Sequence, residues 1–548
     1  MMTVPTLPDN PLLQRNCKRF GQQKFDVLII GAGINGSGIA RDLALRGLRL
    51  ALIDKGDFAS GTSSASTKLI HGGLRYLEQF ALNLVFESCR ERRILQNIAP
   101  HLVTPMPFVI PVYRNDPRSL MTIRAGMVLY DLLAAFRNTR RHRILSPAKA
   151  LDAEPALREE QLTGAALYWD CRMDDARLCL ENVLAAIESG AQAANYLEVT
   201  SLIKRAGRLA GARLLDRETT EEIEIEAEVV INATGPWLDR LCALDGDYSG
   251  KLRPTRGTHV VIPRVGRGNR ALYLSTGRDK RLFFVIPWEA HSLVGTTDVD
   301  YTGDPDAVIP TEDDIVYLLR ETSRHLRCPP IDRADVIASF AGLRPLVTDP
   351  TATASRISRE HRIYQSDSGL ISVGGGKYTT YRAVAEEVAI MVCERLGRGR
   401  GPSRTAEIPL PGGATGPFPA FLSGLTSSLS KEFGLPEPTI DTLLRRYGSR
   451  TRRLMDLLHA RPDLARPIIP GSPLLAGEVI FAADHELTRT PADFLRRRTP
   501  AALRPGRGLD ELPAVIELLG HHLRASAGQR WQWQADYWKQ YNQHEKDS

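Results

Sequence analysis

The chain has 548 residues, of which 43% are hydrophobic and 25% are charged, and these proportions exclude collagen-like, low-complexity and wholly disordered proteins. A total of 71 Lys and Arg against 64 Asp and Glu gives a net charge of +7, carried in short runs only, which argues against nucleic acid as a partner. The nearest approach to a membrane span, residues 125–136, is too short and contains Asp131, so no membrane-spanning helix is predicted.

The first 24 residues and the seven cysteines show no recognisable motif. The N-terminal stretch is polar and has neither the apolar core nor the cleavage site of a signal peptide, so we expect an extension ahead of the folded part. The seven cysteines are scattered and never occur in C-x-x-C spacing. This pattern favours free thiols in a reducing compartment, and it predicts neither a disulfide framework nor a metal site.

A strand, a glycine-rich turn, a helix and a second strand are predicted at the start of the folded part. Residues 25–30 (FDVLII) form an apolar run typical of a buried parallel strand, and GAGING follows at residues 31–36. A helical pattern then runs to Gly47, and the apolar residues 48–53 end in Asp54. This order predicts a βαβ unit that binds a dinucleotide.

Each glycine of the turn has a separate physical task. Gly31 allows the tight turn, Gly33 lets the backbone approach a pyrophosphate, and Gly36 lets the helix pack closely on the strand. The pyrophosphate then meets the N–H groups at the helix N-terminus. Asp54 can accept hydrogen bonds from ribose hydroxyls and would repel a 2′-phosphate, which argues against NADP.

A second glycine signal, INATGPW at residues 231–237, lies far along the chain. It allows the chain to leave the sheet and return, completing a site for a cofactor longer than NAD. The sequence contains no second complete G-x-G-x-x-G motif with a trailing acid, so a separate NAD domain is not predicted. FAD is therefore the expected cofactor.

The remaining patterns divide the chain into three folded parts. Strand-like runs separated by turn residues over 252–299 predict an antiparallel sheet, and residues beyond 416 are largely helical in pattern. We expect a Rossmann-like α/β FAD-binding domain, an antiparallel substrate-binding domain and a C-terminal helical domain. The predicted bounds are an extension over 1–24, the FAD-binding domain over 25–105, 160–245 and 335–396, the substrate-binding domain over 106–159 and 246–334, a linker over 397–416 and the helical domain over 417–548.

Several longer motifs resemble one known family. GTSSASTKLIHGGLRYLE follows GAGING, and NATGPW, IPW, VGTTD, GLRPL and GGGKYTTYR come after it in that order. The sequence is similar to the FAD-dependent glycerol-3-phosphate dehydrogenases, of the D-amino-acid-oxidase-like flavoproteins, over about residues 25–382 and again over 478–499. The polar extension and the aromatic tail, with Trp531, Trp533 and Trp538, depart from the family pattern. For this tail, docking of a final helix onto the core is favoured over anchoring at a membrane interface.

The resemblance implies oxidation of sn-glycerol 3-phosphate at C2 to dihydroxyacetone phosphate, with hydride transfer to flavin N5. It further implies that electrons pass to a membrane quinone from an enzyme bound peripherally to the cytoplasmic face of the inner membrane. A homodimer is left open. The alternatives are a glycerol phosphate oxidase that uses O₂, a flavin oxidase of another 2-hydroxy or 2-amino acid, and a flavin-binding docking module without activity.

Two cations are predicted to act on the substrate. The resemblance places Arg344, in AGLRPL, over the flavin, and because a guanidinium stays protonated we expect it to stabilise the developing alkoxide and not to act as a base. Lys377, in GGGKYTT, is expected to contact the substrate phosphate or hydroxyl, and it could act as the base only with a lowered pKa. A structural arginine and a solvated lysine are the alternative interpretations.

The HGGLRY segment supplies three further candidates. Arg75 is assigned to the substrate phosphate with Tyr76 beside it, and His71 to proton transfer, because histidine titrates nearest neutrality. A buried histidine that only satisfies a backbone carbonyl is an equal alternative. His259, in GTHVVIP, is the competing base, and the sequence leaves the choice open between these two histidines and Lys377.

The other predicted contacts line the substrate cavity or bind the cofactor. Thr297 and Asp298 are weaker candidates for the substrate cavity. The predicted cofactor contacts comprise the three glycine signals, the strand-terminal acid and the serine-rich segment; ordinary turns and N-caps are the structural alternatives. They are Gly31, Gly33, Ile34, Asn35, Gly36, Asp54, Lys55, Thr62, Ser63, Ser64, Ser66, Lys68, Leu69, His71, Gly72, Gly73, Ala233, Thr234, Gly235, Trp237, Gly342, Arg344, Gly375, Gly376, Lys377, Thr379 and Thr380.

Overall fold

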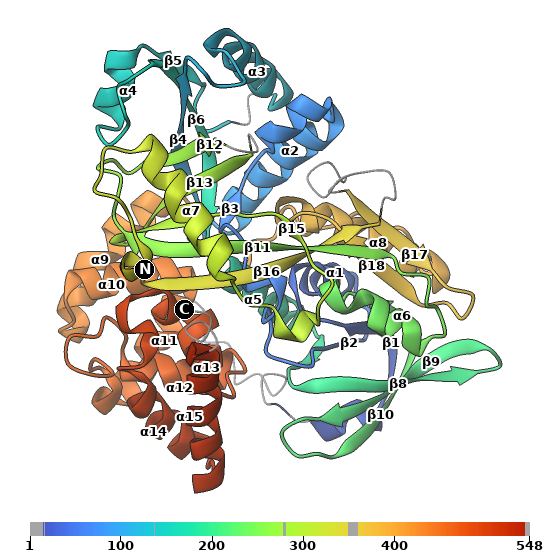
Figure 1. Cartoon of the computed structure of the whole chain (residues 1–548). Coiled ribbons are helices and arrows are strands. Elements are labelled where there is room, and N and C mark those ends of the chain that lie inside the picture. Colours follow the sequence, from blue (N-terminus) through green and yellow to red (C-terminus); the bar gives the residue numbers. More distant parts are fainter. Residues whose placement is uncertain (1–14, 16, 136–137, 278–280, 349–359, 543–548) are drawn as a thin grey trace.

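The structure, a computed structural model, describes residues 15, 17–135, 138–277, 281–348 and 360–542. Two β-sheets and a group of helices make up the molecule (Figure 1). The helices that follow residue 417, coloured orange to red, gather at the lower left, and the long strands β11 (Leu252–Pro263) and β16 (Ala338–Val347) cross the centre. Among the described residues, no helix is long and apolar enough to cross a membrane.

The first sheet contains the predicted βαβ unit. Its strands lie in the order β17-β18-β10-β1-β2-β7, and β8 and β9 extend from β10 as an antiparallel ribbon. The five strands from β18 to β7 are parallel to one another. The bounds are β1 (Lys24–Ile30), β2 (Leu50–Ile53), β7 (Gln192–Ala194), β8 (Leu197–Arg205), β9 (Arg208–Asp216), β10 (Glu222–Asn232), β17 (His361–Gln365) and β18 (Ile371–Gly375).

Both faces of this sheet are covered, which explains the continuous apolar run of β1. Val27 and Ile29 pack with the helices α1 (Ile34–Leu45), α5 (Asp175–Glu188) and α8 (Tyr381–Arg395). Leu28 and Ile30, on the opposite face, pack with the β8–β9 ribbon and α6 (Leu238–Leu244). A parallel strand buried on both sides has no polar alternation, as the sequence predicted.

The second sheet lies in the order β15-β11-β14-β13-β12-β4-β6-β3, with β16 beside β11 and β5 beside β6. The predicted antiparallel pairing holds from β11 to β13, but β12 and β4 pair in parallel. Strands β3, β6 and β16, predicted within the FAD-binding domain, pair in this second sheet instead. The bounds not yet given are β3 (Leu69–Ile70), β4 (Val103–Tyr113), β5 (Arg143–Leu145), β6 (Leu162–Met173), β12 (Ala271–Ser275), β13 (Leu282–Trp288), β14 (His291–Gly295) and β15 (Val299–Asp300).

The helices outside the first sheet fall into two sets. Four of them accompany the second sheet: α2 (Leu82–Ile98), α3 (Leu120–Leu133), α4 (Pro147–Ala153) and α7 (Glu312–His325). The C-terminal helical part, as predicted, follows them in the chain. It comprises α9 (Phe418–Phe433), α10 (Glu437–Tyr447), α11 (Thr451–Ala460), α12 (Ala476–His485), α13 (Pro491–Asp493), a π-helix (Phe494–Arg498), α14 (Leu512–His522) and α15 (Ala527–Asn542).

The connections differ from the sequence predictions in two places. The second half of the predicted linker 397–416 is packed into the protein, because Leu410 is fully buried and its N–H donates to the carbonyl of Ile98 at 2.8 Å. Of the predicted extension, residues 1–14 and 16 lie outside the described residues, and Cys17–Gln22 forms a short 3-10 helix with Phe20 buried. A polar composition therefore did not indicate which residues pack.

Candidate active site

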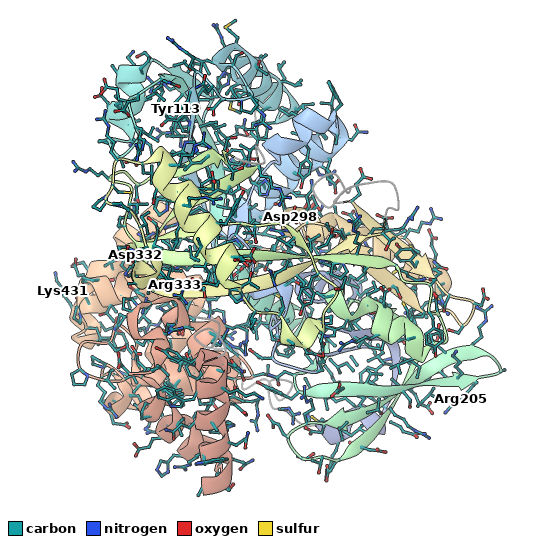
Figure 2. The ribbon with its side chains drawn as sticks, viewed as in Figure 1. Tyr113, Arg205, Asp298, Asp332, Arg333 and Lys431 are labelled. Atoms are coloured by element: carbon teal, nitrogen blue, oxygen red, sulfur yellow. The ribbon has the colours of Figure 1, made fainter. Side chains whose placement is uncertain are left out.

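A cavity of about 530 Å³ lies between the two sheets, at the carboxyl ends of the parallel strands β1, β2, β10 and β18. This is the position where open α/β sheets bind ligands. The structure brings most of the predicted residues to its wall: Gly31, Gly33, Ile34, Asn35, Asp54, Lys55, Thr62, Ser63, Ser66, Leu69, His71, Tyr76, Ala233, Thr234, Gly235, Trp237, His259, Thr297, Asp298, Gly342, Arg344, Gly375, Gly376, Lys377 and Thr379. Figure 2 shows Asp298 near the centre of the molecule, far from Arg205 on the β8–β9 ribbon.

The glycine turn has the geometry that its motif predicted. Gly31 adopts φ +102°, a conformation that disfavours other residues. A Cβ on Gly36 would lie 1.8 Å from the carbonyl oxygen of Gly31, so only glycine lets α1 pack this closely on the turn. Gly36 itself does not line the cavity and acts through that packing.

The end of β2 also carries the predicted acid. Asp54 accepts hydrogen bonds from the N–H groups of Ala32 at 2.7 Å and Gly56 at 2.9 Å. Burial raises the pKa of Asp54 to about 6, although both N–H donors act in the opposite direction. Lys55 and Trp237 lie beyond it, where the Lys55 ammonium sits 4.5 Å from the indole centroid and pairs with Asp306 at 2.6 Å.

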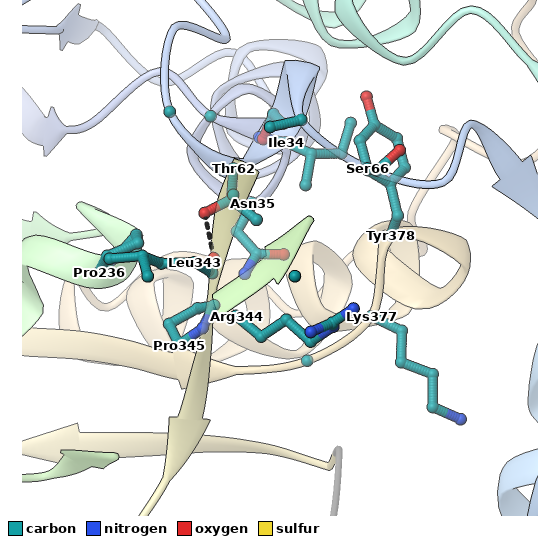
Figure 3. Close-up of a pocket in the computed structure, with 18 of the residues that line it drawn as sticks. Ile34, Asn35, Thr62, Ser66, Pro236, Leu343, Arg344, Pro345, Lys377 and Tyr378 are labelled. Carbon is teal, nitrogen blue, oxygen red and sulfur yellow. Dashed lines mark hydrogen bonds between the residues drawn. The ribbon is translucent and has the colours of Figure 1, made fainter. Parts of the chain in front are cut away.

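The serine-rich segment is divided between the cavity and the protein interior. Ser63 Oγ accepts the N–H of Ile34 at 2.9 Å, and Thr62 Oγ1 donates to the carbonyl of Leu343 at 2.6 Å (dashed in Figure 3). Ser64 and Lys68 were predicted to contact the cofactor, but neither lines the cavity. Lys68 turns inward because its ammonium pairs with the carboxylate of Asp175 and donates to the carbonyl of Ser64.

The paired glycines after His71 do not line the cavity themselves, contrary to the prediction. The N–H of Gly72 donates to Asp170 Oδ1 at 3.1 Å, and a Cβ on Gly72 would lie 2.2 Å from the Tyr130 hydroxyl. Gly73 donates its N–H to Nδ1 of His71 at 3.1 Å. The close approach that these glycines permit is therefore to neighbouring protein groups.

At the other end of the cavity, Arg344 and His259 lie on the neighbouring strands β16 and β11. The Arg344 guanidinium donates to Thr296 Oγ1 at 3.0 Å and to Asp298 Oδ1 at 3.2 Å. His259 Nε2 is 3.0 Å from Thr67 Oγ1. Burial lowers the pKa of His259 well below 6.5, with further contributions from the charges of Arg344 and Lys68, so the imidazole is neutral at physiological pH.

Lys377 comes from the glycine-rich loop between β18 and α8. Its ammonium lies 3.5 Å from the ring centroid of Tyr76, a cation–π contact that joins two predicted substrate residues. In Figure 3, Lys377 points away from Thr62 and from the serine-rich segment. Thr379 bonds with the backbone of His71, whereas Thr380 is the N-cap residue of α8 and does not line the cavity. The Arg75 side chain lies outside the described residues.

Sequence reasoning missed several lining residues. Arg281 donates to the carbonyl of Asp298 at 2.7 Å, and Tyr273 stacks on Phe284 with ring centroids 4.4 Å apart. Asp170 lines the cavity from β6, where a buried acid inside the apolar run AALYWDC was an available signal. The aromatic pair gave no signal, because strand aromatics are common in cores.

These features fit FAD. The bare turn allows backbone contact with a pyrophosphate, Asp54 stands where a ribose would lie, and the cavity continues well beyond both toward Arg344. The family described as FAD dependent oxidoreductase matches residues 26–389, and the C-terminal domain of alpha-glycerophosphate oxidase matches residues 403–530. Fold and site thus define an FAD-dependent oxidoreductase of the D-amino-acid-oxidase-like class, and FAD is the cofactor, as predicted.

Comparison with individual proteins narrows this class. The glycerol-3-phosphate dehydrogenase of Synechocystis sp. is 40% identical over 528 residues, covering 93% of this chain and 94% of that protein. The aerobic glycerol-3-phosphate dehydrogenase of Bacillus subtilis is 37% identical and covers 87% of each. The X-ray structure of the Bacillus halodurans glycerol-3-phosphate dehydrogenase complexed with FAD gives a TM-score of 0.82 at 31% identity over 96% of both chains. The chain belongs to the family of FAD-dependent glycerol-3-phosphate dehydrogenases.

Proposed function

We propose that this chain oxidises sn-glycerol 3-phosphate at C2 to dihydroxyacetone phosphate. The observation that carries the proposal is the meeting of Arg344, Lys377 and His259, from three separate segments, in the cavity that begins at the Gly31 turn. The names of the relatives support the same substrate. When bound, FAD supplies the two-electron acceptor, which takes the C2 hydride at flavin N5.

Each cation is assigned to a different group of the substrate. We assign the phosphate dianion to Lys377, together with Arg75 as the sequence predicts, and the oxygen on C2 to Arg344. The hydrogen bonds of Arg344 to Thr296 and Asp298 fix its guanidinium before substrate binds. A charge already oriented toward a developing alkoxide needs no reorganisation during the reaction.

We assign removal of the hydroxyl proton to His259. Its lowered pKa keeps the ring neutral, and a neutral imidazole has a nitrogen lone pair that can accept a proton. In His71, Nδ1 accepts the Gly73 N–H, so the proton of the neutral ring lies on Nε2. His71 is therefore suited to donate a hydrogen bond to the substrate.

We further propose a membrane quinone as the electron acceptor and a peripheral position on the cytoplasmic face of the membrane. Large apolar side chains are exposed on α3, on the first turns of α2 and just before α2, and the two helices pack together (Figure 1). They are Phe80 (86% exposed), Phe86 (42%), Met121 (70%), Val128 (45%) and Leu132 (68%). Exposed apolar patches of this kind mark binding surfaces.

A groove on the second sheet is lined by basic groups. Arg140, Arg143 and Arg270 line this groove of about 420 Å³ with Trp169, and the first two come a short way beyond the end of α3 in the chain. Apolar and basic groups together suit an anionic lipid surface. Tyr76 lines the cavity and the exposed Phe80 follows it closely in the chain, so we propose that a quinone reaches the cavity from this side.

In the decisive experiment, the purified yellow protein is mixed anaerobically with sn-glycerol 3-phosphate and the flavin absorbance is followed at about 450 nm. We expect bleaching that glycerol does not cause, and re-oxidation by added quinone but not by air. Re-oxidation by air with release of peroxide would instead establish an oxidase, the alternative that the match to the C-terminal domain of alpha-glycerophosphate oxidase favours. A flavin-loaded protein that does not bleach contradicts the proposed substrate.

Membrane binding is tested separately by sedimentation with vesicles that contain an anionic phospholipid. A triple variant, Phe80→Ser with Met121→Ser and Leu132→Ser, should lose at least about tenfold in the bound fraction. Tyr248→Ser removes a side chain that is 82% exposed elsewhere and serves as the control. Equal binding of the triple variant and wild type would contradict the assigned surface.

A further inference from the structure

A cluster of buried charged side chains joins the C-terminal helical part to the loop after β2. We call it the junction cluster, and its members are Asp57, Arg177, Arg450, Glu486, Asp493, Arg497 and Arg498. The Arg498 guanidinium donates two hydrogen bonds to the Asp57 carboxylate, at 2.6 Å to Oδ2 and 2.9 Å to Oδ1. Arg497 binds the same carboxylate, so one acid of the loop meets two guanidinium groups from the π-helix.

The loop that carries Asp57 also holds the glycine turn. The N–H of Ala59 donates to the carbonyl of Ala32 at 3.1 Å, while Asp54 accepts the N–H of the same residue at 2.7 Å. Ala32 lies between Gly31 and Gly33, so both of its backbone polar groups are bound by this one loop. A displacement of Asp57 would therefore displace the turn that receives the pyrophosphate.

A second connection runs from the junction cluster through α5. Glu486 forms a paired interaction with Arg177 of α5, at 2.8 and 3.2 Å. Two residues earlier, at the start of α5, Asp175 accepts both the N–H and the hydroxyl of Ser66, and its carbonyl accepts the Tyr378 hydroxyl. Ser66 and Tyr378 both line the cavity, from the serine-rich segment and from the glycine-rich loop.

The described residues of the helical part do not themselves line the cavity. In the portion of the chain that the structure describes, no residue beyond Thr379 lines the cavity. The charges of the junction cluster interact strongly, because Arg498 and Arg497 lower the pKa of Asp57 to about 2 although its burial acts in the opposite direction. Buried charges of this kind are satisfied only while the partner element stays docked.

We propose that docking of the C-terminal helical part is thermodynamically coupled to FAD binding, with Arg498 as the positioning residue. Arg498 fixes Asp57, and through Ala59 it fixes Ala32 and the glycine turn. Coupling of two equilibria is reciprocal, so bound FAD also stabilises the docked helical part.

The test compares two buried arginines. Arg498→Gln removes the two-pronged guanidinium partner of Asp57, on the cofactor loop, and leaves Arg497 bound to it. Arg446→Gln removes the guanidinium partner of Glu478 inside the helical part, where the Tyr447 hydroxyl still donates to Glu478. The holoenzyme is diluted and release of FAD is followed by the rise in flavin fluorescence. We expect release at least about tenfold faster for Arg498→Gln and within about twofold of wild type for Arg446→Gln, although both variants lower Tm.

The increase in Tm on addition of FAD provides the second readout. We expect this increase to be equal in Arg446→Gln and wild type, and smaller in Arg498→Gln. Should Arg498→Gln fail to fold, Arg498→Lys carries the test, since lysine keeps the charge but lacks the guanidinium fork, and we expect intermediate FAD release. Unchanged release in the Arg498 variant overturns the proposal. Equal acceleration in both arginine variants also overturns it, because general loss of stability would then explain the effect. No substrate is used, so the outcome is independent of the proposed oxidation of glycerol phosphate.

Discussion

The two ends of the cavity are built in different ways. At the nucleotide end, the backbone groups of a single turn and the carboxylate of Asp54 come from one βαβ unit. At the substrate end, side chains from separate segments meet: His71 from just after β3, His259 from β11, Arg344 from β16 and Lys377 from the loop after β18. The first end is local in sequence, and the second exists only when both sheets have formed and packed together.

This difference also sets what each end tolerates. A backbone site depends on the absence of atoms, so that one added methyl group can destroy it. A side-chain site depends on the charge and reach of single groups, so its variants should fold, bind FAD and lose only the reaction steps that each group serves.

The largest effect is expected from Gly36→Ala. The added Cβ would lie 1.8 Å from the Gly31 carbonyl oxygen, so α1 must move away from the turn. Overpacking of this severity costs about 3 kcal/mol of unfolding free energy, and we expect FAD content to fall below about a tenth of wild type. The ratio of flavin absorbance to protein absorbance in the purified variant measures it.

Gly126→Ala is the matched control, because a Cβ on this α3 glycine meets nothing within 4 Å. It should retain full FAD content. If Gly36→Ala also retained its flavin, the nucleotide end would not depend on the bare backbone, and the contrast between the two ends would fail.

The same contrast explains what could be read from the sequence. The turn and Asp54 followed from a spacing of residues within one supersecondary unit. Gly72 and Lys68 were misassigned because a permissive glycine or a cation gives no sign of which neighbour it faces, and here the neighbours were Asp170 and Asp175. The side chains at the substrate end were found through the family resemblance, since no local pattern records which strands of the second sheet lie side by side.

Arg344→Gln should give the next largest effect and leave FAD bound. Loss of a preoriented charge at a developing oxyanion slows reactions by about 100- to 1,000-fold, and we expect that loss in the rate of flavin reduction by sn-glycerol 3-phosphate. Single-turnover absorbance measurements report this step directly. Arg253→Gln, which removes an exposed partner of Asp300 on the adjacent strand, should react within about twofold of wild type. Equal rates for wild type and Arg344→Gln would remove Arg344 from the reaction.

The two histidines should differ in the same assay. Replacement of a general base costs about 100-fold or more, so His259→Asn should be slower than His71→Asn, which loses only a hydrogen-bond donor. The opposite order would return His71 to the role of base.

The pH dependence sharpens this assignment. Because the pKa of His259 is lowered, the ring stays neutral to well below pH 6.5, and kcat/KM should fall only in that acid range. Arg344→Gln removes a neighbouring cation, so the pKa of His259 rises and the acid limit moves to higher pH. For stability, a lowered folded-state pKa means that free energy of unfolding is lost as pH falls from about 6.5 toward the folded value, and His259→Asn should reduce that slope in Tm. The lowered pKa values of His325 and His485 should maintain the rest of the slope. If the fall in kcat/KM at low pH occurred at the same pH in wild type, Arg344→Gln and His259→Asn, a role for His259 would be contradicted.

The smallest effect concerns the contact between Lys377 and Tyr76, two predicted substrate residues. Tyr76→Leu removes the aromatic face 3.5 Å from the Lys377 ammonium, whereas Tyr76→Phe keeps it. A cation–π contact contributes about 0.5–2 kcal/mol, so Tyr76→Leu should raise KM by roughly 2- to 30-fold with kcat little changed, and Tyr76→Phe should stay within about twofold. Steady-state kinetics with quinone as acceptor separate the two constants. If Tyr76→Phe raised KM as much as Tyr76→Leu, the hydroxyl would be the group that matters, and Tyr76 would bind substrate directly.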